Sequence, residues 1–212
     1  MPVRVKICGI TNVTDAEQAA SLGADAIGLN FYAKSPRYID AAMTRLILNL
    51  LPPFVEPVAL FVNEALAEAQ RTAHALNLRM IQLHGDHREA LPPGSMRWIP
   101  AFSVKDGAGL LTISSYLEKL LSAGAVPAAV LVDAHVPGRY GGTGQIVPWQ
   151  LLADFKPGVP LILAGGLTPD NVADAIRIVR PYAVDVASGV ESSPGKKDPD
   201  KMRRFIDAVG GV

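Results

Sequence analysis

Two residues that could exchange protons with a substrate stand where apolar runs of the sequence end. Cys8 is the only cysteine of the chain and ends the run 3–8, directly before Gly9. Asp133 ends the run 128–133 and is followed by the glycine-rich stretch HVPGRYGGTG. A thiol and a carboxyl group on opposite sides of one substrate can act as general base and general acid. Plainer alternatives stay open, because a lone cysteine is often an inert core residue and Asp133 could cap a turn or pair with Arg139.

Lys6 is the residue expected to influence Cys8. Alternation along a strand places Lys6 and Cys8 on one face. If that face is the interior of a barrel, the ammonium group of Lys6 would favour the thiolate and so lower the pKa of Cys8 below its reference value of about 8.5. An unpaired interior charge is costly, and Asp185 lies on the last apolar run. We therefore predict a contact between Lys6 and Asp185 inside the barrel.

Two glycine-bearing loops could hold a phosphate group. The segments LAGGLTPDNV and DVASGVE each place glycines between an apolar run and a helix-like segment. Glycine lets backbone N–H groups approach an anion, and a helix N-terminus adds partial positive charge. Each loop alone would read as a tight turn, but two of them on adjacent strands favour a phosphorylated small molecule. The residues concerned are Gly165, Gly166, Ser188 and Gly189.

Arg37 and His84 are weaker candidates for substrate contacts. Arg37 lies in FYAKSPRYID, and its guanidinium fork matches a carboxylate or a phosphate, although a loop arginine is more often only solvated. His84, in QLHGD, is as readily a structural histidine as a substrate contact. No metal site is predicted, because the four histidines lack H-E-x-x-H spacing and one cysteine cannot supply a ligand set.

Composition excludes several classes of protein. The 212 residues include 20 basic and 20 acidic side chains, so the formal net charge is zero. A neutral chain lacks the basic excess of a nucleic-acid-binding protein, and one cysteine excludes a disulfide scaffold. The first twenty residues do not resemble a signal peptide, and the apolar runs are shorter than the ~20 residues of a membrane span. We expect a cytoplasmic globular protein with no nucleic-acid or membrane partner.

One rhythm fills the chain: a short apolar run, a polar or glycine cluster, and a helix-like segment. The runs are 3–8, 26–31, 58–62, 80–83, 97–102, 128–132, 161–164 and 183–187. The helix-like segments are 14–22, 41–51, 64–76, a short one after Asp86, 110–122, 149–155, 171–179 and 198–209. Continuous apolar runs are typical of strands covered on both faces, and strands separated by helices pair in parallel. The pattern predicts a single α/β domain over residues 1–212, a (β/α)8 TIM barrel. An open doubly wound sheet is the alternative, but G-x-G-x-x-G is absent after the first run.

The chain as a whole resembles one family of barrel enzymes. The matching segments are VKICGIT, GLNFYAKSPRYI, LFVN, QLHGD, VDAHVPGRYGGTG, LAGGLTPDNV and DVASGVESSPGKKD. They are similar to those of phosphoribosylanthranilate isomerase, from about residue 5 to residue 205. The resemblance implies an isomerase of tryptophan biosynthesis that performs an Amadori rearrangement of N-(5-phosphoribosyl)anthranilate without a cofactor.

The resemblance also implies roles for individual residues. Asp133 would protonate the furanose ring oxygen, Cys8 would remove the C2′ proton, and Arg37 would hold the anthranilate moiety. Asp185 would lie near the sugar hydroxyls. The phosphate would bind Gly165, Gly166, Ser188 and Gly189, and the segment containing Gly142, Thr143 and Gly144 would form a loop beside Asp133.

Alternative functions remain at this point. The chain could be another phosphosugar-binding barrel enzyme, an epimerase or a different isomerase, or a barrel that binds phosphosugars without catalysis. A metal-dependent epimerase would need convergent His and Asp ligands, which the sequence does not offer. A monomer and a homodimer fit the sequence equally well.

Overall fold

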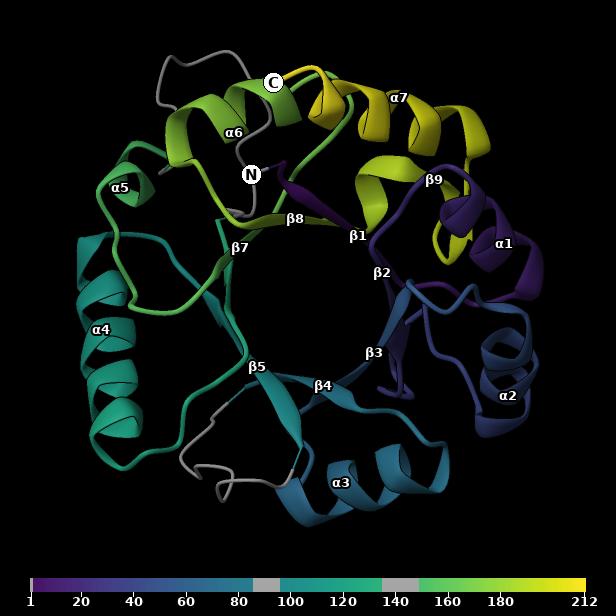
Figure 1. Ribbon diagram of the computed structural model, residues 1–212, viewed down its shortest axis with the longest axis horizontal. Helices are drawn as coiled ribbons and strands as arrows, with labels where there is room; N and C mark the ends of the chain where they lie inside the picture. Colours follow the sequence, from purple (N-terminus) through teal and green to yellow (C-terminus); the bar gives the residue numbers. More distant parts are fainter. Residues whose placement is uncertain (1, 86–95, 135–148) are drawn as a thin grey trace.

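Eight parallel strands close into a barrel in the order of the sequence (Figure 1). The computed structural model describes residues 2–85, 96–134 and 149–212. Each strand pairs with the next, and β8 pairs with β1 to close the ring. The closed ring confirms the predicted (β/α)8 barrel and excludes the open doubly wound sheet. The strands are β1 (Arg4–Cys8), β2 (Ala26–Asn30), β3 (Glu56–Val62), β4 (Met80–His84), β5 (Arg97–Ser103), β6 (Val130–Asp133), β7 (Leu161–Ala164) and β8 (Ala183–Val186).

Helices surround the barrel and cover its outer face (Figure 1). They are α1 (Val13–Ser21), α2 (Ala41–Leu50), α3 (Leu66–Ala75), α4 (Gly107–Ser122), α5 (Trp149–Ala153), α6 (Val172–Val179) and α7 (Pro199–Gly210). Each lies within three residues of its predicted bounds, and the helix expected after Asp86 falls outside the described residues. None of the described helices is long and apolar enough to cross a membrane.

Alternation along the strands divides the buried side chains into two layers. Outward-facing residues such as Ile7, Ile27 and Val184 belong to a large apolar cluster that includes the buried faces of the helices. Inward-facing residues form a smaller cluster inside the barrel, which includes Leu131 and Ile162. Burial on both faces explains why the strands read as continuous apolar runs.

A short antiparallel hairpin follows β8 and was not predicted. The 3-10 turn η1 (Ser188–Val190) leads into β9 (Glu191–Ser193), which pairs with β10 (Lys196–Lys197). The hairpin lies beside α1 (Figure 1), and Thr11 Oγ1 donates a hydrogen bond to the carbonyl of Gly195 at 2.6 Å. It therefore extends the carboxyl end of the barrel, where the candidate site residues lie.

Candidate active site

Cys8 and Asp133 both end strands and both belong to the inner face of the barrel. Cys8 is two residues beyond Lys6, and Asp133 is two residues beyond Leu131, which is part of the inner cluster. Because side chains alternate along a strand, both groups take the inward direction at the carboxyl end. Cys8 is 6% exposed and Asp133 is half-buried. β1 and β6 are separated by β7 and β8 in the closed ring, so the thiol and the carboxyl group enter one interior from different sides.

The predicted contact between Lys6 and Asp185 is confirmed. Lys6 Nζ lies 2.8 Å from Asp185 Oδ1, and the two residues are register partners on β1 and β8. Their side chains are 5% and 9% exposed. Burial acts to lower the pKa of Lys6, but the charges and hydrogen bonds of Asp185 and Cys8 together prevail and hold that pKa above its ordinary value. Lys6 therefore carries its charge inside the barrel, directly below Cys8.

Lys6 acts on Cys8 in the expected direction, because its charge lowers the pKa of the thiol, but burial was not anticipated and prevails. Burial raises the pKa of the Cys8 thiol above its ordinary value, and the positive charges of Lys6 and Lys197 offset this only in part. Desolvation acts against any anion at this position, whereas each cation is already engaged by a carboxylate. Without substrate, Cys8 is therefore held as a thiol rather than as a thiolate.

Gly28 makes room for the pair that Cys8 and Lys6 form. A Cβ at this position would lie 2.6 Å from Cys8 Sγ and 3.0 Å from Lys6 Nζ. Gly28 is also the register partner of Cys8 on the neighbouring strand β2. Any larger residue would displace the thiol or the ammonium group, so this glycine belongs to the site. Gly28 was not predicted as a site residue, because a glycine inside a strand gives no sign of what approaches it.

Arg37 is fixed at the carboxyl end by a buried carboxylate. Glu191 accepts hydrogen bonds from Arg37 Nε and Nη2, both at 2.7 Å. The stem of Arg37 passes over Gly9, where a Cβ would lie 2.5 Å from Arg37 Cδ. The loop before it is held by Ser35 Oγ, which accepts from the backbone N–H of Arg37 at 3.1 Å. Arg37 is thus placed beside Cys8 and is not merely solvated.

Lys197 is a second residue near the site that was not predicted from the sequence. Its Nζ donates to Glu191 Oε1 and to the carbonyl of Ala187, both at 3.0 Å, and its side chain is 0% exposed. Burial lowers the pKa of Lys197, against the opposing pull of Glu191. Burial also acts to raise the pKa of Glu191, but the hydrogen bonds and charges of Arg37 and Lys197 prevail and lower it. The sequence signal was SPG between Glu191 and Lys196, a turn pattern that indicates a hairpin.

The two loops expected to bind phosphate pack against each other. Gly165 and Gly166 follow β7 with φ angles of 95° and 64°, which favour glycine. Ser188 and Gly189 form the turn after β8, and a Cβ on Gly189 would overlap the carbonyl oxygen of Leu167. Asn171 at the start of α6 donates to the carbonyl of Gly166 at 2.9 Å and fixes the first loop. The structure therefore brings these four residues into one neighbourhood.

The remaining candidates differ in how they are placed. His84 ends β4 with its Nε2 2.7 Å from Gln82 Nε2, so it belongs to an interior polar pair. Gly142, Thr143 and Gly144 lie outside the described residues. Within the ranges 2–85, 96–134 and 149–212, no cluster of three or more His, Cys, Asp or Glu could hold a metal ion.

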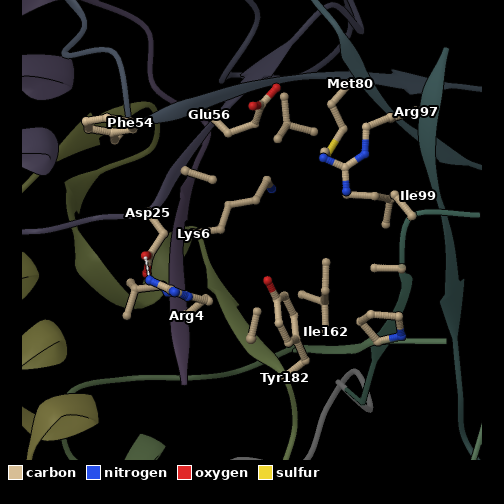
Figure 2. Close-up of a pocket in the computed structure, with 17 residues that line it drawn as sticks. Arg4, Lys6, Asp25, Phe54, Glu56, Met80, Arg97, Ile99, Ile162 and Tyr182 are labelled. Carbon is tan, nitrogen blue, oxygen red and sulfur yellow. Dashed lines mark hydrogen bonds and ion pairs between the residues drawn. The ribbon is translucent and has the colours of Figure 1, made fainter. Parts of the chain in front are cut away.

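A separate cavity of about 470 Å³ opens at the opposite, amino-terminal end of the barrel. Figure 2 shows Lys6, Arg97 and Tyr182 directed toward it, with Ile99 and Ile162 among the apolar residues of its wall. Its lining includes the first residues of several strands, and neither Cys8 nor Asp133 is among them. The candidate active site is therefore at the carboxyl end, as in other barrels of this kind.

The fold and the site together define an enzyme of the (β/α)8-barrel class, with its acid and base candidates at the carboxyl ends of the strands. Comparison with known proteins identifies the family within this class. The sequence profile of the family described as N-(5'phosphoribosyl)anthranilate (PRA) isomerase matches residues 5–208. The chain belongs to the N-(5'-phosphoribosyl)anthranilate isomerase family.

Individual relatives are similar over almost their whole length. The N-(5'-phosphoribosyl)anthranilate isomerase of Acidithiobacillus ferrooxidans is 49% identical over 211 residues, covering 99% of this chain and 98% of the relative. The crystal structure of phosphoribosyl anthranilate isomerase from Thermotoga maritima has a TM-score of 0.85 at 40% identity and covers 99% of this chain and 100% of its own. A further isomerase structure, in complex with reduced 1-(o-carboxyphenylamino)-1-deoxyribulose 5-phosphate, has a TM-score of 0.81 at 38% identity, with coverage of 99% and 100%.

Proposed function

We propose that Asp133 is the general acid and Cys8 the general base of the reaction that this family catalyses. Family membership assigns the activity: an isomerase of tryptophan biosynthesis that converts N-(5'-phosphoribosyl)anthranilate to 1-(2-carboxyphenylamino)-1-deoxyribulose 5-phosphate. The observation that carries the residue assignment is the shared inward direction of Cys8 and Asp133 at the carboxyl ends of β1 and β6. Groups that enter one interior from different sides can act on two different atoms of one sugar.

The reaction proceeds through two proton transfers. Asp133 gives a proton to the furanose ring oxygen, the C1′–O bond breaks, and the electron pair of the anilino nitrogen forms a protonated Schiff base. The Cys8 thiolate then removes the C2′ proton, and the C–H electron pair forms the C1′=C2′ bond while the nitrogen regains its electrons. The resulting enolamine becomes the ketone when C1′ gains a proton and the 2′-hydroxyl loses one. Only protons are exchanged, so the balance needs no oxidant or reductant.

The raised pKa of Cys8 fits this order of events. A thiol that is neutral in the free enzyme is a weak base, but ring opening creates a cationic Schiff base next to it. A nearby positive charge favours the thiolate, and Lys6 and Lys197 already contribute in that direction. The Cys8 thiol then gives its proton to solvent water at the open end of the barrel, and the thiolate so formed accepts the C2′ proton.

The other candidates bind and orient the substrate in this proposal. Arg37 receives the carboxylate of the anthranilate ring, and the loops with Gly165, Gly166, Ser188 and Gly189 receive the phosphate. Asp185 keeps Lys6 charged through Oδ1 and contacts a sugar hydroxyl through its second oxygen. Holding the remote phosphate aligns the sugar for both proton transfers. His84, Gly142, Thr143 and Gly144 are proposed as further substrate-binding residues.

The proposal also covers the setting of the enzyme. We expect it to act in the cytoplasm on a free phosphosugar, without a nucleic-acid partner or a cofactor. A related structure is described as monomers of a dimeric isomerase from Thermotoga maritima. A monomer or a homodimer is accordingly proposed for this chain.

The test follows the disappearance of substrate fluorescence. N-(5'-phosphoribosyl)anthranilate is generated in situ from anthranilate and phosphoribosyl pyrophosphate, and its fluorescence loss is compared with and without the protein. Cys8→Ala and Asp133→Asn should each lower kcat by about 10²–10⁴-fold while retaining the native melting transition. Asp174→Asn is the control, because its carboxylate is exposed on α6 and forms a surface ion pair with Arg177. Near-normal kcat in either site variant would contradict the assigned roles.

A further inference from the structure

The carboxyl end of the barrel carries a charged cluster whose purpose is not explained by the two proton transfers. Arg37, Glu191 and Lys197 form it, with Glu191 between two cations. The side chains of Glu191 and Lys197 are 5% and 0% exposed, whereas that of Arg37 retains 23%. Glu191 and Lys197 are thus buried, whereas Arg37 is partly exposed at the carboxyl end of the barrel.

Glu191 engages only one edge of the Arg37 guanidinium. Its two oxygens accept from Nε and Nη2, and Nη1 has no hydrogen-bond partner among the residues that the structure describes. A guanidinium offers five N–H donors in a planar fork. A carboxylate on one edge fixes the plane of the fork and leaves donors at its end for a second carboxylate. The stem of Arg37 lies over Gly9, which directly follows Cys8, and the guanidinium is near enough to interact electrostatically with the Cys8 sulfur.

The β9–β10 hairpin fixes the cluster to the loop that carries Arg37. Gly195 has a φ of 81°, and a Cβ there would lie 2.5 Å from the carbonyl oxygen of Pro36, directly before Arg37. The backbone N–H of Lys197 donates to Asp15 Oδ2 at 2.9 Å and ties the other side of the hairpin to α1. The position of Glu191 relative to Arg37 is therefore determined by packed backbone and not by flexible side chains alone.

The net charge of the cluster depends on Lys197. An Arg37–Glu191 pair alone would be neutral, and the carboxylate would weaken the attraction of the guanidinium for another anion. Lys197 restores a net charge of one positive unit to the three groups. Burying an ammonium group without solvent is costly, and an apolar side chain of the same length would fill the space. A buried cation here is explained if the site must receive an anion.

We propose that Glu191 and Lys197 are positioning residues that orient Arg37 and keep its surroundings positive for the carboxylate of the substrate's anthranilate ring. The inference rests on the proposed function, in which Arg37 binds that carboxylate. Neither residue touches the reacting atoms. Their effect is expected in binding and in the discrimination between ligands with and without the ring carboxylate, rather than in proton transfer.

Comparing the binding of two inhibitors distinguishes a positioning role of Glu191 and Lys197 from a purely structural role. One is reduced 1-(o-carboxyphenylamino)-1-deoxyribulose 5-phosphate, and the other is the same compound with a plain phenylamino group. In Glu191→Gln and Lys197→Met, the inhibition constant of the first should rise roughly ten- to a hundredfold, while that of the second changes by less than about threefold. The KM for substrate should rise in parallel, with kcat changed much less. Only folded protein binds either inhibitor, so the ratio of the two inhibition constants can still be measured for a variant that is less stable.

Lys201→Met is the matched control. Lys201 Nζ also contacts Glu191, but it donates to the backbone carbonyl at 2.8 Å and not to the carboxylate. This variant should leave the ratio of inhibition constants unchanged. If Glu191→Gln and Lys197→Met do not change the discrimination between the two inhibitors, Arg37→Ala shows whether the positioning role or the role of Arg37 is wrong. Loss of discrimination in Arg37→Ala but not in Glu191→Gln and Lys197→Met overturns the positioning role alone, and normal discrimination in Arg37→Ala overturns the role of Arg37 itself.

Discussion

Lys6 and Asp185 are 179 residues apart in the sequence and 2.8 Å apart at Nζ and Oδ1. The pair joins the first strand of the barrel to the last, at a register position that backbone hydrogen bonds also define. It lies one layer below Cys8, so it connects closure of the fold with the charge around the proposed base. We therefore expect substitutions at this pair to affect both stability and activity.

Removing Lys6 should destabilise the protein strongly. Lys6→Met leaves the Asp185 carboxylate buried and unpaired, and the free energy of unfolding should fall by about 3–5 kcal/mol. Urea denaturation followed by circular dichroism measures the change. Arg4→Met is the control on the same strand, because its pair with Asp25 is half exposed and should contribute only about 0–1 kcal/mol. Equal losses in the two variants would contradict the importance given to the buried pair.

Gly28→Ala should disturb the site without removing any functional group. The new methyl group would lie 2.6 Å from Cys8 Sγ, so the thiol or the strand must shift. Overpacking of this kind costs about 1–3 kcal/mol, and kcat should fall by roughly tenfold or more because the base is displaced. Gly107→Ala is the control, since a Cβ at the start of α4 meets nothing within 4 Å. Wild-type activity in Gly28→Ala would show that Cys8 tolerates displacement.

The reactivity of Cys8 toward iodoacetamide should increase with pH. Burial raises the pKa of the thiol above its ordinary value, so the alkylation rate should climb steadily from neutral pH to above pH 9. Unfolded protein in urea, which titrates near the reference pKa of about 8.5, gives the comparison. A rate that is already constant below pH 8 would mean that the thiolate predominates in the free enzyme.

Acid should weaken the Arg37–Glu191–Lys197 cluster. Burial opposes the ionised form of Glu191, but the two cations prevail and its pKa in the folded protein lies below its ordinary value. Its stabilising contribution is therefore complete above the unfolded pKa of about 4.3 and is lost as the pH falls through the folded value. The difference in unfolding free energy between the wild type and Glu191→Gln should shrink over this range. A difference that is independent of pH would exclude ionisation of Glu191 as its source.

Local periodicity was enough to predict the barrel and the interior pair. Alternation from Lys6 to Cys8 identified the inward face of β1, and eight repeats of strand and helix required β8 to return beside β1. The contact between Lys6 and Asp185 follows from these two facts together. The positions of Cys8 and Asp133 at strand ends were predicted by the same reasoning.

The charged cluster could not be predicted in this way. The segment ESSPGKK has no apolar period, and its hairpin is determined by contacts with Thr11, Asp15 and Pro36 from distant parts of the chain. The net shift in the pKa of Cys8 could not be predicted for a related reason. Alternation identifies the neighbour Lys6, but the balance between its charge and the loss of solvent depends on packing from every side.

Lys6 also borders the cavity at the amino-terminal end of the barrel (Figure 2). Its stem reaches the wall of that cavity while its ammonium group binds Asp185. Protein engineers who fill the cavity to raise thermal stability, or who introduce a binding site for a foreign ligand there, can alter Ile99, Ile162 or Arg97, none of which is a proposed active-site residue. Lys6 is the residue they must leave in place, because any change that tilts it would be transmitted through the floor of the barrel to the thiol above.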